Sequence, residues 1–379
     1  MRISTTQLNN ILFQSMQRNS SALNETYNQV STGKRILQPA DDPIDTVRLL
    51  QLGDEKAALE QYQGNIETLE RDLAREESVL GSMNNVLQRM REISLQAGNG
   101  SYGQGELNAL AVELDELVEQ LQGYGNYQLA DGQYLFSGTR TNTKPVQQAS
   151  GSFSYAGNNQ QRNVSISSFS KVPANDTARS LLFNVSLTAS YSSGAPQLNS
   201  YDINNLEVFG QYTEIRITHN GSDFTVEYDL LDGSTDVENI AAGTSLALKG
   251  VAVELTAAPV SGDVITIKPN DILSGIKQFS DNLKSGGAFD GDEALIMVDN
   301  TLARVGETQT SVGKRLNILS SVKASHEDIK LLGEELRTAL EDVDLAEAIS
   351  RMKLQEAILQ ASQQAYASID QLGLFNYIR

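Results

Sequence analysis

The sequence predicts an α+β protein whose two helical ends enclose a β-rich middle. Apolar residues recur every three or four positions near both termini and through one very long segment, whereas residues 141–284 alternate with a period of two. We therefore expect an elongated chain with paired terminal helices, a long antiparallel coiled-coil rod and an inserted antiparallel β domain. The expected domains are 1–35 with 345–379, 36–140 with 285–344, and 141–284.

The first helix is predicted from Leu8 to Val30. Leu12, Met16, Leu23 and Val30 follow steps of four and three residues, with Asn19 and Thr26 filling the two gaps, and Gly33 is expected to stop the helix. A similar stripe begins at Leu345 and runs through Ile349, Met352, Leu359 and Tyr366. Both stripes are narrow and interrupted by polar residues, so each helix needs a partner: the other terminus, a copy of the chain, or both.

The second helix begins after Asp42, which suits the N-cap, with Pro43 at the first helical position and Asp45 in the first turn. We interpret these aspartates as capping residues and not as metal ligands. Its stripe is the longest in the chain: Leu59, Tyr62, Ile66, Leu69, Leu73, Glu76, Leu80, Met83, Leu87 and Met90. The polar Glu76 is expected at a solvated edge of the seam.

The glycine-rich segment 98–105 is predicted to be a turn between antiparallel helices. No strand precedes it and no Lys-Ser/Thr follows it, which argues against a phosphate-binding loop. A third helix follows with Leu107, Leu110, Leu114, Leu117, Leu121 and Tyr124 on one stripe. Residues 131–139 are expected to form a turn and a short strand.

The β-rich middle carries one strong hairpin signal. Ile215 and Ile217 alternate with polar residues, Asn220-Gly221 turns the chain, and a second alternating run follows. Further strands are predicted around residues 183–187, 251–255 and 265–267, and residues 284–288 are read as a linker. The helical stripe then resumes through Leu295, Val298, Leu302, Val305, Val312, Leu316 and Leu319, and continues through Ile329, Leu332, Leu336, Leu340 and Val343.

Composition excludes several function classes. The net charge is −19 without a cluster of Lys and Arg, which argues against nucleic-acid partners and against docking on anionic membranes. The absence of cysteine removes thiol catalysis, cysteine-based zinc sites and disulfides. No secretory leader and no membrane-spanning run is recognised. We expect a chain that is cytoplasmic, or exported without a cleaved signal peptide.

No catalytic, cofactor-binding or metal-binding residues are predicted, and we interpret the protein as a non-enzyme without a cofactor. His326 is expected at a core edge, because no carboxylate or histidine lies near it at the spacing of a metal site. His219 is expected on the surface, because it precedes the Asn220-Gly221 turn. Glu341, Asp342, Asp344 and Glu347 are interpreted as solvated charge or helix-start residues.

The terminal motifs resemble the bacterial flagellin family. Arg2-Ile3-Ser4-Thr5, Ser31-Thr32-Gly33-Lys34-Arg35-Ile36 and Asp41-Asp42-Pro43 resemble its amino-terminal region. Asp344-Leu345-Ala346-Glu347-Ala348 and the segment from Gln371 to Ile378 resemble its carboxy-terminal region. Within the family, the first five residues and Tyr134–Thr139 look most like the members at the junction of flagellar hook and filament. The resemblance covers roughly the first 145 and last 95 residues.

This resemblance implies an inner tube of paired terminal helices, a rod outside it and a β domain facing solvent. It implies a structural part of the extracellular flagellum: a ring of like subunits at the hook–filament junction that contacts a neighbouring hook-associated protein and flagellin. It also implies type III export with the help of a flagellar export chaperone. Two alternatives remain: a filament-forming flagellin, and a cytoplasmic coiled-coil scaffold with a β binding module.

We expect the terminal segments to be poorly ordered in the free subunit and to fold as neighbouring subunits supply apolar contacts, because ordering costs about 1–2 kcal/mol per residue. The residues expected at this assembly interface are Leu8, Leu12, Met16, Leu23, Val30, Leu345, Ile349, Met352, Leu359, Ile369, Leu372 and Phe375.

Overall fold

The computed structural model describes residues 5–98, 102–149, 152–192, 194–231, 233–286 and 291–371. The chain forms two compact units, Met1–Gly64 with Val322–Arg379, and Asn65–Ser321. We call them the terminal unit and the central unit. The three-part division expected from the sequence remains a prediction.

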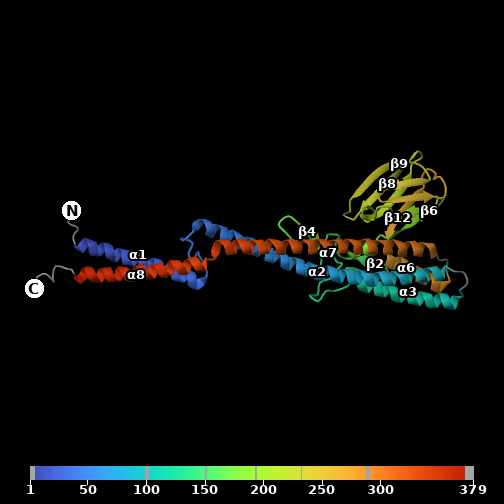
Figure 1. Ribbon diagram of the computed structural model, residues 1–379. Helices are drawn as coiled ribbons and strands as arrows, with labels where there is room; N and C mark the ends of the chain where they lie inside the picture. The colour runs from blue at the N-terminus through green and yellow to red at the C-terminus, as the bar shows by residue number, and fades with distance from the viewer. Residues whose placement is uncertain are drawn as a thin grey trace, which may run out of the picture. The chain divides into compact units, whose positions relative to one another are not determined.

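The described residues confirm the α+β fold class, with helices at both ends and a β region inserted between them (Figure 1). The helices are α1 Thr5–Thr32, α2 Pro43–Ala97, α3 Gln104–Gly125, α4 Ala178–Leu182, α5 Leu206–Phe209, α6 Ile272–Ser285, α7 Gly291–Glu341 and α8 Leu345–Gln371. All five helices predicted from apolar spacing are present, and the continuous stripe predicted from Leu295 to Val343 corresponds to α7, which ends at Glu341.

The core of the central unit lies along the predicted stripe of α2. Every stripe residue from Ile66 to Met90 is buried, and this includes Glu76. The expectation that Glu76 is solvated was therefore wrong. Its carboxyl group accepts a hydrogen bond from the backbone N–H of Asp176 at 3.0 Å, and Arg315 of α7 donates to the Asp176 carboxylate at 2.9 Å. A polar contact from the β region thus replaces apolar packing at this step of the seam.

The predicted stripe of α7 is only partly buried. Its valines, such as Val305 and Val312, are buried in the central unit, but Ile329, Leu332 and Leu336 are exposed in the terminal unit. In this part of α7, the face turned toward α2 carries the polar residues Lys330 and Glu334. Lys330 pairs with Glu60 at 4.0 Å, and Glu334 pairs with Lys56 at 2.6 Å. The apolar residues beside them therefore stay at the surface, contrary to the prediction.

Within the described residues, the strands form four antiparallel sheets. The strands are β1 Val146–Ala149, β2 Ser152–Tyr155, β3 Asn163–Ser165, β4 Lys171–Pro173, β5 Ser186–Tyr191, β6 Leu198–Asp202, β7 Tyr212–His219, β8 Asp223–Leu230, β9 Thr235–Ala241, β10 Ser245–Leu248, β11 Val251–Leu255 and β12 Val264–Asn270. A five-stranded sheet has the order β5-β12-β7-β8-β9, a three-stranded sheet the order β10-β11-β6, and β1-β2 and β3-β4 are separate hairpins.

The predicted hairpin is the pair β7–β8, with His219 opposite Phe224 across the Asn220-Gly221 turn. Gly221 adopts a positive φ of 101°, which this tight turn requires. Inward-facing residues of the two larger sheets, among them Ile215, Val226, Val253 and Ile267, form one apolar core. His219 was expected at the surface but is buried, because its ring packs edge-on against Phe224 at 5.1 Å.

Two features of this part of the chain differ from the sequence expectations. The range 141–284 also contains α6, which packs against α3 and was not predicted. Tyr134–Thr139 forms turns and isolated bridges and no strand. Gly138 explains this, since its φ is 71° and an added Cβ would lie 2.2 Å from the backbone oxygen of Asn158. A regular strand cannot form around that close approach.

One buried cation joins the β region to α7. The Arg304 guanidinium donates to three backbone carbonyls, those of Ser180, Phe183 and Asn184, at 2.7–2.9 Å. Asn300, one helical turn earlier, donates to the carbonyl of Val185 at 2.9 Å. Burial lowers the pKa of Arg304 to about 10. The five-stranded sheet is therefore tied to the helices through the segment that leads into β5.

Candidate assembly surface

The terminal unit begins with α1, which ends as the sequence predicted. The N–H of Gly33 donates to the carbonyl of Gln29 at 2.9 Å, and Gly33 adopts a φ of 73°. A left-handed residue just past the last turn is a common helix stop, and glycine adopts it without strain. The chain direction after α1 is thus set locally by Gly33.

A short antiparallel bridge ties the head of the chain to its tail. The N–H of Arg35 donates to the carbonyl of Glu341 at 2.6 Å, and the N–H of Val343 donates to the carbonyl of Gly33 at 3.0 Å. The Arg35 guanidinium also donates to the carboxylates of Asp42 and Asp45, at 3.1 and 2.7 Å. The bridge places the end of α1 beside the start of α8.

The two aspartates before and within α2 act as the sequence predicted. Asp42 accepts the N–H of Asp45 at 3.1 Å, which is an N-cap contact. That hydrogen bond, followed by the contact with Arg35, lowers the pKa of Asp42. Asp344 likewise accepts the N–H of Ala346 and of Glu347 at the start of α8. These carboxylates are therefore explained by helix capping.

Helices α1 and α8 pack along each other with a heptad seam (Figure 1). On α1 the stripe positions Leu12, Met16, Asn19, Leu23, Thr26 and Val30 are half-buried or buried, as are Ser20, Ala22 and Gln29 beside them. On α8 they are Ala348, Met352, Gln355, Leu359, Ser362 and Tyr366. Both sets repeat at alternating steps of three and four residues, which is the periodicity of a two-helix coiled coil.

This seam is thin and partly polar. Most of its apolar members are only half-buried, and Thr26 and Ser362 satisfy their hydroxyls on carbonyls of their own helices. Within the part of the chain that the structure describes, the Oε1 atom of Gln355 is buried without a hydrogen-bond partner, which costs stability. A pair of helices joined by such a seam has apolar surface left to bury.

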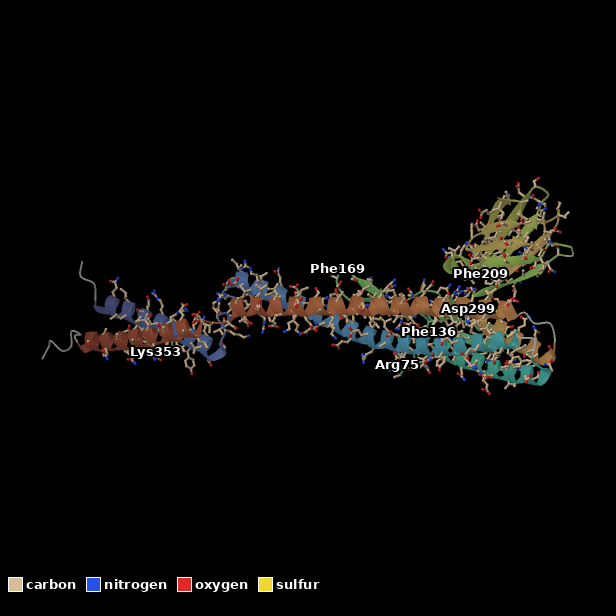
Figure 2. All side chains as sticks on the ribbon, turned by 45° about the vertical axis from the view of Figure 1, so that its right-hand side comes forward. Arg75, Phe136, Phe169, Phe209, Asp299 and Lys353 are labelled. Carbon is tan, nitrogen blue, oxygen red and sulfur yellow. The ribbon has the colours of Figure 1, made fainter. Side chains whose placement is uncertain are left out.

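That remaining surface includes residues that sequence reasoning missed. Ile11, Phe13 and Tyr27 on α1, and Leu354 and Ile358 on α8, are exposed. They lie outside the heptad stripe, so the prediction of one apolar face per helix did not include them. The signal available was the four-residue spacing of Leu354 and Ile358, which marks a second apolar face on α8. Lys353, labelled in Figure 2, precedes Leu354 on the same helix.

The predicted interface residues fall into three groups. Leu12, Met16, Leu23, Val30, Met352 and Leu359 lie half-buried in the seam between α1 and α8, whereas Leu345 and Ile349 are exposed. The side chains of Leu8 and Ile369, and the whole of Leu372 and Phe375, lie outside the described residues. The role of all twelve residues in assembly remains a prediction.

The described residues contain no group of three or more His, Cys, Asp or Glu side chains placed to hold a metal ion. His326 is buried beside Tyr62, with ring centroids 6.0 Å apart, and burial lowers its pKa. Within the described ranges, no helix has an apolar stretch of the length that a bilayer crossing requires.

Comparison with known proteins gives consistent results. The family model "bacterial flagellin N-terminal helical region" matches residues 3–141. Flagellar hook-associated protein 3 of Salmonella typhimurium is 25% identical over 352 residues, which are 93% of this chain and 91% of that protein. A flagellin of Clostridium tyrobutyricum is 22% identical over 378 residues, 96% of this chain and 97% of the relative.

Among solved structures, flagellar hook-associated protein 3 of Legionella pneumophila has the same fold, with a TM-score of 0.55 and 22% identity over 76% of this chain and 98% of that one. The terminal motifs, the matched N-terminal region and the nearly full-length alignments agree. The predicted resemblance to the flagellin family, and within it to flagellar hook-associated protein 3, is therefore confirmed.

Proposed function

We propose that this protein is a structural component of the bacterial flagellum that joins the hook to the filament. The observation that carries the proposal is the terminal helix pair, which combines a half-buried, partly polar seam with exposed apolar residues on its outer faces. The nearly full-length similarity to flagellar hook-associated protein 3 supports this position in the flagellum.

The mechanism follows from the cost of ordering two helices of 28 and 27 residues. The thin seam buries little apolar surface, whereas ordering the helices costs about 1–2 kcal/mol per residue in conformational entropy. Neighbouring subunits cover Ile11, Phe13, Leu354 and Ile358, so folding of the termini and assembly of a ring of like subunits become one event. The twelve predicted interface residues act in this step, some within the chain and some between chains.

The partners and route are part of the same proposal. The ring contacts a neighbouring hook-associated protein on one side and flagellin on the other, and a flagellar export chaperone accompanies the chain before type III export without a cleaved signal peptide. The proposed location is the extracellular flagellum, and the role is structural and not enzymatic.

A paired substitution on α8 tests the proposal. Leu354→Glu with Ile358→Lys removes exposed apolar surface, while the four-residue Glu–Lys spacing favours the helix. We expect this variant to be exported but absent from isolated hook–filament junctions. The matched control places the same charges at the exposed polar positions Gln360→Glu and Gln364→Lys and should incorporate normally. Normal incorporation of the first variant would count against the proposal.

The two alternatives predict other distributions. The similarity of this chain to a flagellin motivates the first alternative. A filament-forming flagellin would be labelled along the whole filament and would polymerise alone into long filaments. A cytoplasmic scaffold would be found in the cytosol and never in sheared flagella. Labelling confined to the hook–filament junction supports the junction role.

A further inference from the structure

An exposed aromatic side chain stands at the tip of the β3–β4 hairpin. Phe169 is 92% exposed and projects from the hairpin in Figure 2. The turn that carries it is internally bonded, with the N–H of Ser170 donating to the Ser167 hydroxyl at 3.0 Å and the N–H of Ile166 donating to the carbonyl of Ser170 at 3.0 Å. Phe169 is therefore presented by an ordered turn, which reduces the entropy lost on binding.

The hairpin is also fixed at its base. Asn65 of α2 donates to the carbonyl of Ser165 at 2.9 Å, and Ile166 and Val172 are buried. A large apolar ring held in water on an anchored turn is a natural contact residue, because aromatic anchors carry much of the energy of protein interfaces.

The terminal unit contains an apolar groove of about 300 Å³ between the first turns of α2 and the last turns of α7. Leu49, Leu52 and Leu59 line it from α2, and Ile329 lines it from α7. Leu50, also a lining residue, is 65% exposed. We call this the α2/α7 groove. The groove lies where α7 turns the polar residues Lys330 and Glu334 toward α2.

Two glycines keep the α2/α7 groove open. Gly53 and Gly333 line it from opposite helices, and a Cβ added to either would meet nothing within 4 Å. Glycine in a helix interior is less stable than alanine, and here no contact within the chain requires it. The space that these glycines leave is available to a neighbouring molecule.

We propose that Phe169 of one copy inserts into the α2/α7 groove of the next copy. The contact rests on the proposed function, because a ring needs two different complementary surfaces on each subunit, a heterologous interface. Phe169 is exposed, so its ring is available to a neighbouring molecule. The groove is large enough to take a phenyl ring.

The uncharged hairpin tip favours a copy of the chain as the occupant of the apolar groove. The residues beside Phe169 at the hairpin tip are the neutral Ser168 and Ser170, so docking carries no charge into the apolar groove. At the rim of the groove, Lys56 pairs with Glu334 at 2.6 Å, and this contact lowers the pKa of Glu334.

The contact can be tested by crosslinking because the chain has no cysteine of its own. Phe169→Cys combined with Leu50→Cys should give a covalent ladder of subunits when isolated junctions are oxidised. Each single variant, and Phe169→Cys combined with Val260→Cys on the β domain, should give no ladder. Incorporated double-cysteine subunits that crosslink no better than the Val260 control would overturn the proposal.

Substitution provides a second, independent readout. Phe169→Ala and Gly333→Leu should each lower incorporation at the junction about tenfold or more, the first by removing the ring and the second by filling the groove. The double variant should lose little more than either single one, since both remove one contact. The controls are Val260→Ala and Gly313→Leu, the latter on α7 away from the groove with equally open space.

The outcomes separate the two proposals. Incorporation of Phe169→Ala at the wild-type level would refute the contact and leave the junction role intact. Absence of the wild-type chain from the junction would refute the proposed function and, with it, the basis of the contact.

Discussion

The buried carboxyl of Glu76 predicts a pH-dependent stability of the central unit. Burial, followed by the nearby charge of Asp176, raises the pKa of Glu76 from 4.5 to about 8. Arg315 acts in the opposite direction but is already paired with Asp176. Glu76 is therefore protonated in the folded protein at neutral pH. The perturbation is Glu76→Gln, which keeps the shape of the neutral carboxyl and cannot ionise.

The magnitude follows from the difference between the folded and unfolded pKa values. The pKa of Glu76 is higher in the folded chain than in the unfolded chain, so proton binding at Glu76 stabilises the folded state. This stabilisation is complete below pH 4.5 and declines as the pH rises to about 8. Over that window the wild-type chain loses roughly 3–5 kcal/mol of stability. Glu76→Gln should remove that slope, so the variant gains on the wild type as the pH increases.

The assay is native-state hydrogen exchange of the amides in residues 66–87 of α2, measured at pH 5, 6.5 and 8 after correction for intrinsic rates. Glu77→Gln is the matched control, because Glu77 is the next residue and is exposed. The control should show the wild-type pH slope. An equal slope in Glu76→Gln, or an equal loss of stability at every pH, would refute the reasoning.

Three further substitutions test single contacts. Arg304→Met should destabilise the central unit by about 3 kcal/mol, measured by urea unfolding, because it removes a buried hydrogen bond to the Phe183 carbonyl and two part-buried ones; a change under 1 kcal/mol would contradict this. Gly138→Ala should cost about 2 kcal/mol or more in thermal unfolding, since its Cβ meets the Asn158 carbonyl oxygen; an unchanged Tm would contradict it. Arg35→Ala should cost about 1 kcal/mol or less, because the ion pairs are half-exposed, but should speed amide exchange at residues 341–343; unchanged exchange there would show that the bridge does not depend on its guanidinium.

The helices could be predicted because one apolar face determines each of them. The α2 stripe from Ile66 to Met90 and the hairpin around Asn220-Gly221 depend on local periodicity and turn chemistry, which the sequence states directly. Capping by Asp42 was predictable for the same reason. Local signals thus account for the elements that the structure confirms.

The departures come from long-range contacts that periodicity does not encode. Glu76 is buried because a backbone N–H a hundred residues away reaches it, and α7 leaves Ile329, Leu332 and Leu336 exposed because polar residues face α2 there. At the assembly surface, a single stripe per helix identified the seam but missed the second face of α8. A surface completed by another molecule is not visible in the pattern of one chain.

The most direct test of the terminal helix pair is hydrogen exchange on the dilute monomer and on assembled junctions. We expect amides of α1 and α8 to exchange much faster than residues 66–90 of α2 in the monomer, and to become protected on assembly, because neighbours bury the outer apolar faces. Protection of both terminal helices in the dilute monomer equal to that of residues 66–90 would contradict the account.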